Sequence, residues 1–499
     1  MSKAIMVQGT MSNAGKSLLC AGLCAAFRQE GLSVAPFKSQ NMALNSFITR
    51  DGLEMGRAQV VQAEACGIEP DVRMNPILLK PVTDVGSQVI VNGEVRGNYD
   101  AGAYFAMKKQ LVPDILRAYE SLASQYDVIV IEGAGSPAEI NLKTDDIVNM
   151  GMARMAKAPV LLVGDIDRGG VFAQLYGTIA LLDDDEKAFV KATVINKFRG
   201  DVELLKPGLV MLEELTKKPV AGVLPYLKID IDDEDSLSER LERKYEHTLI
   251  DIAVVRLPHL SNFTDFAALE ATHGVGVRYV RKLSELGAPD MVVLPGTKNT
   301  IGDLLWLRQS GLESAIKKQC AAGTPVLGIC GGYQMLGNKI VDASGAEGGG
   351  AADGLGLLPV DTTFAAEKHR TRVKATALEV AGPLSALSGA ALDGYEIHMG
   401  ETIPRDGARP LLSLENGLRD GCQSGNAYGT YLHGFFDSAD VRKAILTALC
   451  ERKGVSDASI GKSGFDFQKY RRDQYDLLGE QIRLHLDMRL IHKILEEGI

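Results

Sequence analysis

Short apolar runs alternate with helix-like segments along most of this chain, and that alternation leaves few folds open. Strands joined by crossover helices give a parallel sheet with helices on both faces. Two such series occur, one on each side of an acidic stretch. The sequence therefore predicts an α/β protein with two doubly wound, mostly parallel sheets. The expected strands are Ala4–Gln8, Ser33–Phe37, Val128–Glu132, Val160–Asp165, Thr193–Asn196 and Val220–Leu224 in the first series, and Ile252–Leu257, Met291–Leu294 and Pro325–Ile329 in the second.

The length of the chain predicts more than one domain, because 499 residues exceed the size at which a single hydrophobic core keeps growing. The stretch Leu227–Lys244 is acidic and has almost no periodic apolar face, so it is interpreted as a linker or exposed edge. The expected division is residues 1–228 for the first domain, 229–249 for the linker, 250–450 for the second domain and 451–499 for a C-terminal helical extension.

Two segments of the second half have their own signals. The glycine- and alanine-rich segment Ala343–Gly356 is expected to be a flexible loop. The segment Tyr475–Leu495 places leucine or isoleucine at every fourth position, which predicts one amphipathic helix packed on its own domain.

The charge balance and the cysteines restrict the class of protein. The formal net charge is -10 and no basic run could follow a phosphate backbone, so no nucleic-acid partner is expected. Any anionic substrate must be met by local positive groups. The seven cysteines show neither metal-type pairs nor a disulfide framework, and no stretch reaches membrane-spanning length. We therefore expect a cytoplasmic protein without a membrane partner.

A phosphate-binding loop is predicted at Gly9–Ser17, Gly-Thr-Met-Ser-Asn-Ala-Gly-Lys-Ser, which follows an expected strand and opens an expected helix. Glycines let backbone N–H groups face phosphate oxygens at the positive end of the helix. Five residues separate Gly9 from Gly15 where the standard loop has four, so the loop is a variant. An ordinary glycine-containing turn is the alternative. The residues expected to bind ATP are Gly9, Thr10, Asn13, Gly15, Lys16 and Ser17, with Ser17 also on Mg²⁺.

Acidic residues end two further expected strands. Glu132 closes the apolar run before Gly133-Ala134-Gly135, and the carboxyl end of a strand lies beside the phosphate loop in a doubly wound sheet. We therefore expect Glu132 to hold the metal with Ser17. Asp165 and Asp167 end the next strand in the same manner, and either could instead cap a helix.

A cysteine nucleophile is predicted at Cys330 in Gly328-Ile329-Cys330-Gly331-Gly332-Tyr333-Gln334. Small neighbours allow the strained strand-to-helix turn that exposes a nucleophile. The thiol needs a base, and His433 in Tyr-Leu-His-Gly is the expected one. His398 is the chief rival, and it could instead be structural or line the same pocket. Packing is the alternative interpretation of Cys330, as it is for most of the other cysteines.

These motifs carry a resemblance. Gly-Ile-Cys-Gly-Gly-Tyr-Gln, with Leu294–Asn299 before it and Tyr-Leu-His-Gly after it, resembles a class I glutamine amidotransferase domain of flavodoxin-like fold. The first half resembles the dethiobiotin synthetase-like ATP-dependent ligases, and the fusion in this order is similar to the corrinoid amidases. Within that group, Ser39–Asn45, Asn75–Pro81 and Asn196–Asp201 resemble the cobyric acid synthases. The resemblance covers essentially the whole chain.

The resemblance implies a substrate and a reaction. It implies amidation of the b, d, e and g carboxylates of the corrinoid (adenosyl)cobyrinic acid a,c-diamide, with one ATP and one glutamine at each step. ATP would convert a carboxylate into an acyl phosphate, and ammonia released from glutamine would attack it. Asn41, Asp146 and Asp165 are the expected substrate-binding residues, with Asp145 as the helix cap beside Asp146. A homodimer is implied by analogy with dethiobiotin synthetase-like domains.

One departure from the family concerns the third catalytic residue. Many relatives place a glutamate two positions after the histidine, whereas here that position is Phe435 and the next acid is Asp437. Either another carboxylate orients His433 or the pair works as a Cys–His dyad, and we favour the dyad. Backbone N–H groups near Gly296 and Gly331 are expected to form the oxyanion hole.

Two other functions remain open at this point. Another glutamine-dependent ligase on the same scaffold, such as an a,c-diamide synthase or a cell-wall-precursor amidase, would differ at Ser39–Asn45 and Asn75–Pro81. A partitioning-type ATPase would use the nucleotide loop for dimerisation, but it leaves Cys330, Gly332 and His433 unexplained.

Overall fold

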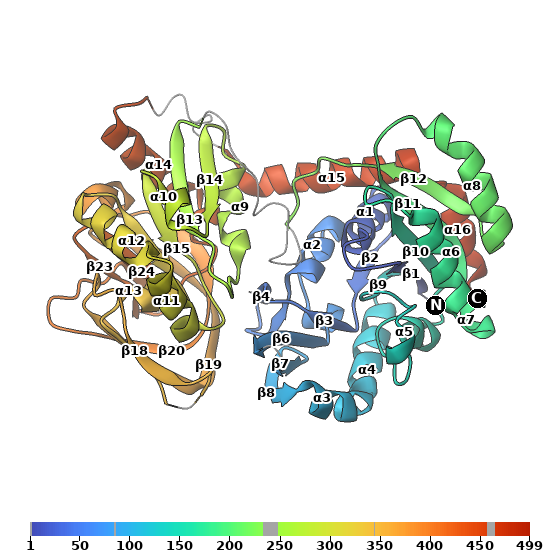
Figure 1. The fold of residues 1–499 in the computed structure, drawn as a ribbon, viewed down its shortest axis with the longest axis horizontal. Coiled ribbons are helices and arrows are strands. Elements are labelled where there is room, and N and C mark those ends of the chain that lie inside the picture. Colours follow the sequence, from blue (N-terminus) through green and yellow to red (C-terminus); the bar gives the residue numbers. More distant parts are fainter. Residues whose placement is uncertain (1, 84–85, 233–247, 344, 457–464) are drawn as a thin grey trace.

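The computed structural model describes residues 2–83, 86–232, 248–343, 345–456 and 465–499. Both predicted parallel sheets are present, one in each half of the chain, and they lie side by side as two bodies (Figure 1). Most of the predicted linker, residues 233–247, lies outside the described residues. No helix among the described residues is both long and apolar enough to cross a membrane.

The first sheet has six parallel strands in the order β12-β11-β10-β1-β9-β2. Each predicted strand of the first series appears within one to three residues of its expected bounds. The strands are β1 (Lys3–Gly9), β2 (Val34–Phe37), β9 (Val128–Glu132), β10 (Val160–Asp165), β11 (Val190–Phe198) and β12 (Val220–Pro225). The helices are α1 (Lys16–Gln29), α2 (Arg57–Cys66), α4 (Val112–Ala123), α5 (Met150–Ala156), α6 (Val171–Leu181), α7 (Asp184–Phe189) and α8 (Val202–Thr216).

Helices cover both faces of this sheet. Because successive side chains of a strand point to opposite faces, Met6 and Ile5 of β1 belong to different buried clusters. Met6 packs in the cluster that includes Ile115 of α4, and Ile5 in the cluster that includes Leu19 of α1. The continuous apolar strands are therefore explained by burial on two sides.

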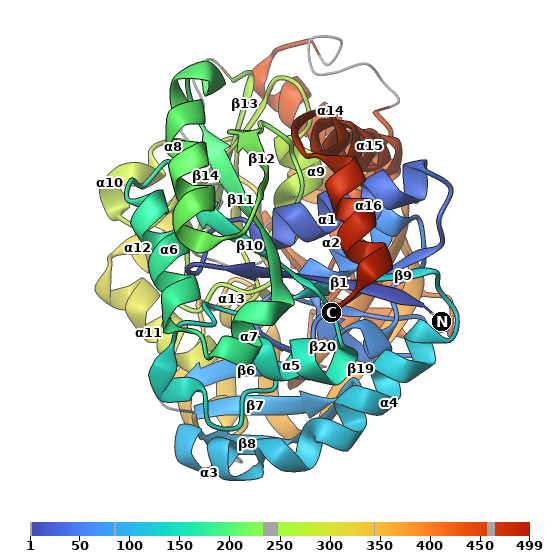
Figure 2. The same ribbon diagram turned by 90° about the vertical axis from the view of Figure 1, so that its right-hand side faces the viewer.

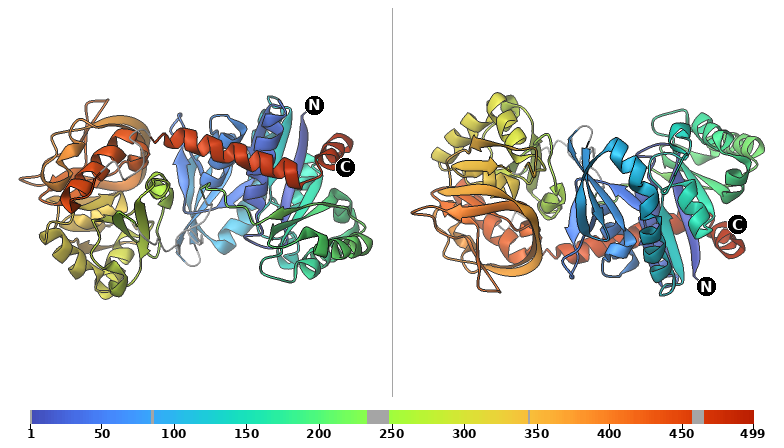
Figure 3. Two further views of the ribbon diagram at one scale, coloured as in Figure 1. Left: turned by 90° about the horizontal axis from the view of Figure 1, so that it is seen from above. Right: turned by 90° about the horizontal axis from the view of Figure 1, so that it is seen from below.

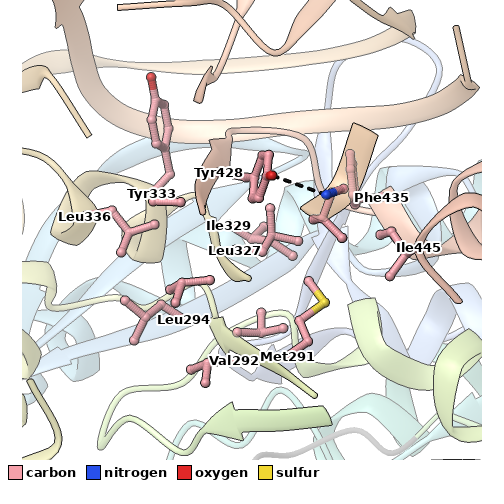
Figure 4. Close-up of a cluster of buried hydrophobic side chains, with 14 of the residues drawn as sticks. Met291, Val292, Leu294, Leu327, Ile329, Tyr333, Leu336, Tyr428, Phe435 and Ile445 are labelled. Carbon is pink, nitrogen blue, oxygen red and sulfur yellow. Dashed lines mark hydrogen bonds between the residues drawn. The ribbon is translucent and has the colours of Figure 1, made fainter. Parts of the chain in front are cut away.

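The second sheet has the order β14-β13-β15-β16-β24-β23, parallel except for β23. Its core gathers Leu294, Leu327 and Ile329 between side chains of the covering helices (Figure 4). The strands are β13 (Ile250–Val255), β14 (Val275–Val280), β15 (Met291–Leu294), β16 (Val326–Ile329), β23 (Cys422–Ser424) and β24 (Ala427–Thr430). The helices are α9 (Ala267–Glu270), α10 (Leu283–Leu286), α11 (Thr300–Gln309), α12 (Leu312–Ala321), α13 (Gly331–Leu336) and α14 (Ala439–Lys453).

Three further sheets were not predicted. The first half contains a four-stranded sheet of β3 (Gln40–Met42), β6 (Ile77–Thr83), β7 (Gly86–Val91) and β8 (Glu94–Asp100), and the helix α3 (Ala101–Met107) follows it. It also contains a two-stranded sheet of β4 (Ser46–Ile48) and β5 (Glu54–Gly56). The second half contains a sheet of six strands, which are β17 (Lys339–Asp342), β18 (Gly350–Asp353), β19 (Val360–Ala377), β20 (Ala391–Pro404), β21 (Leu412–Leu414) and β22 (Arg419–Asp420). The prediction of a loop at Ala343–Gly356 is wrong in part, because β18 lies within this segment and pairs antiparallel with β17.

The C-terminal segment corrects two expectations. It forms two helices, α15 (Phe467–His485) and α16 (Met488–Glu497), because Leu486 adopts an extended conformation and bridges to Gly222 of β12. It also does not stay on its own domain. The start of α15 packs on Ala267 and Ala268 of the second half, whereas Leu478 and Ile482 join the core of the first. Seen from above, α15 crosses from one body to the other (Figure 3).

Glycines let α15 approach α1 closely. A Cβ atom at Gly22 of α1 would lie 2.4 Å from Ile482 Cγ1, and one at Gly479 would lie 2.8 Å from Gln29 Oε1. Both distances are below ordinary contact. The crossing of these two helices therefore depends on the absence of a side chain on each.

Candidate active sites

The phosphate loop lies between β1 and α1, where the sequence predicts it. Gly15 adopts the left-handed conformation at the N-terminus of α1, with φ 99°. The Nζ atom of Lys16 lies 3.1 Å from the carbonyl oxygens of Met11 and Gly135. The ammonium is therefore held over the loop by backbone contacts, and a bound phosphate could replace them.

Glu132 and Ser17 meet at the carboxyl edge of the sheet. The Ser17 hydroxyl donates to Glu132 Oε1 at 2.8 Å, and Lys38 Nζ lies 2.9 Å from the same oxygen. The Gln62 amide donates to Glu132 Oε2 at 2.5 Å. The sequence analysis did not identify Lys38 or Gln62 as site residues, although Lys38 directly follows β2 at the same edge of the sheet. Two hard oxygen donors side by side suit Mg²⁺.

A cavity of about 1340 Å³ opens beside this edge. Asn13, Gly15, Lys16, Ser17 and Asn41 line it, and it extends to Asp145 and Asp146. The volume exceeds the 300–1,000 Å³ typical of a single small-molecule site. Basic side chains are frequent in the lining, and they include Lys38, Lys108, Lys143, Arg154, Arg168 and Lys197. Six acidic side chains also line it, Glu139, Asp145, Asp146, Glu186, Asp230 and Asp232, so an anionic ligand would be met by local basic groups and not by a uniformly positive cavity.

Not every residue expected at this site lines the cavity. Gly9 and Thr10, at the start of the loop, are not among the lining residues, and the Thr10 hydroxyl donates to Gln174 Oε1 at 3.1 Å. Asp165 is fully buried, and its carboxylate pairs with Lys197 at 2.9 Å. The N-terminal flanking residue of α6 is Gly170, so neither Asp165 nor Asp167 caps that helix. Asp165 instead holds a lysine that lines the cavity.

The expected roles of Asp145 and Asp146 are reversed with respect to helix capping. The Asp146 carboxylate accepts from the backbone N–H groups of Val148, Asn149 and Gly151, at 2.8 to 3.0 Å, ahead of α5. Asp145 has φ 65° and pairs with Lys109 at 2.5 Å. The capping interaction belongs to Asp146 because its side chain turns back over the start of the helix.

Cys330 lies on the strained turn that its neighbours predict. Its φ of 52° and ψ of -109° are unusual for a residue with a side chain, and the turn joins β16 to α13. A Cβ atom at Gly332 would lie 1.9 Å from the Leu294 carbonyl oxygen, and one at Gly331 would lie 2.7 Å from Thr297 Cγ2. The two glycines therefore let the turn press against the segment after β15.

His433 has a carboxylate partner, so the favoured Cys–His dyad is wrong. The Nδ1 atom of His433 lies 2.7 Å from Asp265 Oδ2, and the Gly434 N–H donates to Asp265 Oδ1 at 2.9 Å. Asp265 comes from a short 3₁₀ helix, Phe263–Phe266, 168 residues before the histidine. Burial by itself lowers the pKa of His433, but the Asp265 carboxylate and the Cys330 thiol raise it to about 10.

His398 shares the pocket but lacks such a partner. It lines a narrow pocket with Cys330, Gly331 and His433. Its Nδ1 atom lies 2.7 Å from the Gly400 carbonyl oxygen, its ring stacks on Tyr431, and burial lowers its pKa to about 4. The low pKa makes His398 the weaker base of the two histidines, and it lines the same pocket, which is one of the roles expected for it.

Gly296 lies next to His433. A Cβ atom there would be 3.2 Å from His433 Cε1, and the Gly296 carbonyl accepts from the Ser261 N–H at 3.0 Å. The segment that contains Gly296 and Thr297 therefore faces both Cys330 and His433.

One further group of side chains could hold a metal ion among the residues that the structure describes. His369 of β19 and Glu396 and His398 of β20 have ligand atoms within 4.8 Å of one another. His369 Nε2 lies 3.1 Å from Glu396 Oε2, and this pairing raises the pKa of His369. An ion pair therefore accounts for the contact without a metal.

The first half of the chain contacts the second beside His433. The Tyr395 ring stacks on His433 with centroids 5.3 Å apart, and its hydroxyl donates to the Ser46 carbonyl oxygen of β4 at 3.3 Å. The Asn262 amide donates to the same hydroxyl at 3.0 Å. Phe47 meets Tyr395 edge to face. No local sequence signal pairs β4 with β20.

The chain matches two known families. Residues 5–238 match the family described as CobQ/CobB/MinD/ParA nucleotide binding domain, and residues 251–441 match the CobB/CobQ-like glutamine amidotransferase domain. The first match includes the phosphate loop, and the second includes Cys330 and His433.

Full-length relatives are also similar. A cobyric acid synthase from Lachnoclostridium phytofermentans is 57% identical over 516 residues, which cover 100% of both chains. One from Ruminiclostridium cellulolyticum is 58% identical over 506 residues, which cover 100% of this chain and 98% of the relative. The solved structure of PurLQS from Thermotoga maritima is 21% identical and covers 40% of this chain and 99% of its own, with a TM-score of 0.33.

Proposed function

Because the chain belongs to the cobyric acid synthase family, we propose that it amidates four side-chain carboxylates, b, d, e and g, of (adenosyl)cobyrinic acid a,c-diamide. Each step uses one ATP and one glutamine. The observation that carries the proposal is the pairing of a phosphate-loop cavity with a Cys330–His433–Asp265 site in one chain. Residues 1–228 form the ligase domain and residues 250–450 the glutaminase domain.

In the ligase domain, the loop holds ATP through Gly15 and the positive end of α1. Lys16 binds the phosphoryl group that leaves ATP for the substrate carboxylate, and a carboxylic–phosphoric anhydride forms. Ammonia then attacks the acyl carbon, and phosphate leaves with the electron pair of the broken C–O bond. The cavity lies against the loop, so both substrates can meet there.

The donor set at Ser17 and Glu132 fits Mg²⁺, since a hydroxyl and a carboxylate oxygen lie side by side at 2.8 Å. Bound there, the ion would neutralise charge on the phosphate oxygens. Lys38 contributes a further positive charge at the same carboxylate.

In the glutaminase domain, Cys330 attacks the glutamine side-chain amide. His433, oriented by Asp265, gives a proton to the departing ammonia, and the Gly331 N–H at the start of α13 with the backbone near Gly296 stabilises the oxyanion. Water then hydrolyses the thioester to glutamate and restores the thiol.

The proposal extends to the assembly of the enzyme. Leu204, Met211 and Leu215 of α8 are 83%, 61% and 62% exposed and share one face at seven- and four-residue spacing. The helix lies on the outer side of the ligase domain beside α6 (Figure 2). We assign this face to a homodimer. Light scattering should give twice the monomer mass, and Met211→Glu should halve it.

Mass spectrometry of the corrinoid tests the reaction. Incubation of cobyrinic acid a,c-diamide with ATP, Mg²⁺, glutamine and the protein should lower the substrate mass in four steps of about one unit each, as –OH becomes –NH₂. A product that stops after two such steps from cobyrinic acid itself would identify an a,c-diamide synthase instead.

Loss of the nucleophile tests the division of labour. Cys330→Ser should abolish amidation with glutamine but retain it with high ammonia. Loss of both activities in a folded variant contradicts the two-site arrangement.

A further inference from the structure

The pocket around Cys330 is lined by a lysine from the other domain. Lys80 belongs to β6 of the ligase domain, within the Asn-Pro-Ile-Leu-Leu-Lys-Pro segment, yet it lines the pocket with Cys330, His433 and Gln334. Its side chain is 1% exposed. The chemistry assigned so far gives no role to this residue.

Lys80 is part of a buried cluster with an excess of positive charge. Its Nζ atom lies 2.7 Å from Glu54 Oε1 and donates to the Ser46 hydroxyl at 2.8 Å. Lys368 of the glutaminase domain lies 2.6 Å from the other oxygen, Glu54 Oε2. Two ammonium groups thus share one fully buried carboxylate across the domain boundary.

Holding this excess charge away from water is unfavourable. Burial lowers the pKa of Lys80 well below its ordinary value and that of Lys368 to about 8, although Glu54 opposes both shifts. Lys298, which also lines the pocket, lowers both further. A ligand with a carboxylate would relieve the imbalance.

The pocket also carries one negative charge. Glu347 lines it and accepts hydrogen bonds from the Thr300 N–H at 3.2 Å and hydroxyl at 2.9 Å. Cations and an anion around a thiol match a zwitterionic amino acid whose side-chain amide reaches the sulfur. The pocket encloses only about 10 Å³, so lining side chains must move when an amino acid enters.

We propose that Lys80 of the ligase domain binds the α-carboxylate of glutamine, so that docking of the ligase domain completes the glutaminase site. The inference rests on the proposed glutamine hydrolysis. It gives the Asn75–Pro81 segment a function outside its own domain, because β6 places its lysine at the domain boundary while Ile77 and Leu79 stay in the ligase core.

Steady-state release of ammonia from L-glutamine and from L-glutamine α-amide, in which a neutral carboxamide replaces the α-carboxylate, tests the proposal. The wild type should favour glutamine in kcat/KM by about ten- to a hundred-fold, the range for a hydrogen bond to a charged group. Lys80→Met should raise the KM for glutamine by a similar factor and bring the ratio of the two substrates close to one. If Lys80 had a purely structural role, the substitution would lower kcat/KM for both substrates equally and leave their ratio unchanged.

Lys368→Met is the matched control, because Lys368 shares Glu54 but does not line the pocket. It should keep the wild-type ratio. Amidation with ammonia and a thermal melt confirm that each variant is folded, and Lys80→Gln replaces Lys80→Met if the latter does not fold. A wild-type ratio near one, or a wild-type ratio retained without Lys80, overturns the inference. Absence of glutamate release from the wild type would instead refute the proposed function.

Discussion

The Nδ1 atom of His433 lies 2.7 Å from the Oδ2 atom of Asp265, 168 residues earlier in the chain. Both side chains are almost fully buried. Because a fixed carboxylate sets which imidazole nitrogen carries a proton, this contact orients His433 toward Cys330.

Replacement of that carboxylate should separate the two activities. Asp265→Asn should lower glutamine-dependent amidation by on the order of 10³- to 10⁴-fold, as expected when a buried acid no longer fixes the histidine tautomer. Amidation with ammonia should not change. Asp437→Asn is the control, because Asp437 is a half-buried acid of the second domain that lies four residues after His433, whereas the His433 ring is paired with Asp265. Equal losses in the two variants would contradict the assignment.

The raised pKa of His433 predicts a pH profile. The folded pKa of about 10 lies above the ordinary value near 6.5, so the stabilisation from the imidazolium is fully present below about pH 6.5 and is lost as pH rises through about 10. We expect kcat/KM for glutamate release to fall on an alkaline limb near pH 10. Asp265→Asn should move that limb to lower pH, and an unmoved limb would assign it to another group.

Loss of the loop lysine should affect only the ligase reaction. Lys16→Ala should lower amidation by on the order of 10²- to 10³-fold with either nitrogen source, because a charge on the transferred phosphoryl group is lost. Glutamate release should persist. Unchanged ATP turnover, measured as ADP formation, would rule out the phosphate-loop assignment.

Removal of divalent metal should also affect only the ligase reaction. Excess EDTA should abolish amidation with ammonia and leave glutamate release intact. Glu132→Gln should raise the Mg²⁺ concentration needed for half-maximal amidation, since one carboxylate ligand is lost. Asp165→Asn, at the end of β10, which β1 separates from β9, should not shift that concentration, because the Asp165 carboxylate pairs with Lys197 rather than with Ser17.

The contact between α1 and α15 should tolerate no side chain at Gly22. Gly22→Leu should cost about 1–3 kcal/mol of unfolding free energy through overpacking against Ile482. Gly177→Leu is the control, because Gly177 is also helical and its Cβ position meets nothing within 4 Å. Denaturant melts compare the two, and equal stabilities would show that α15 can shift without cost.

The features that could be predicted from the sequence depend on residues close together in the chain. Strands such as Val128–Glu132 and Met291–Leu294 are buried on both faces, so they are short apolar runs that end where the fold needs a loop. The strain at Cys330 was likewise predictable from the glycines beside it. These features depend on neighbouring residues only.

Contacts between distant segments were not predictable. The strands β19 and β20 carry mixed polar and apolar residues and pair with each other, which leaves no apolar run to detect. Asp265 reaches His433, and Lys80 reaches the Cys330 pocket, only because separate elements meet in the folded chain. The capping role of Asp146 over Asp145 depended on the direction of one side chain.

The path of α15 has a consequence for synthesis of the protein. Leu478 and Ile482 cover α1, but roughly 450 residues separate them from its end at Gln29. At translation rates of about 5–20 residues per second, α1 waits roughly 20 to 90 seconds for its covering helix. During that time an apolar surface of the first domain is exposed to solvent, and a chain interrupted after the second sheet never covers it.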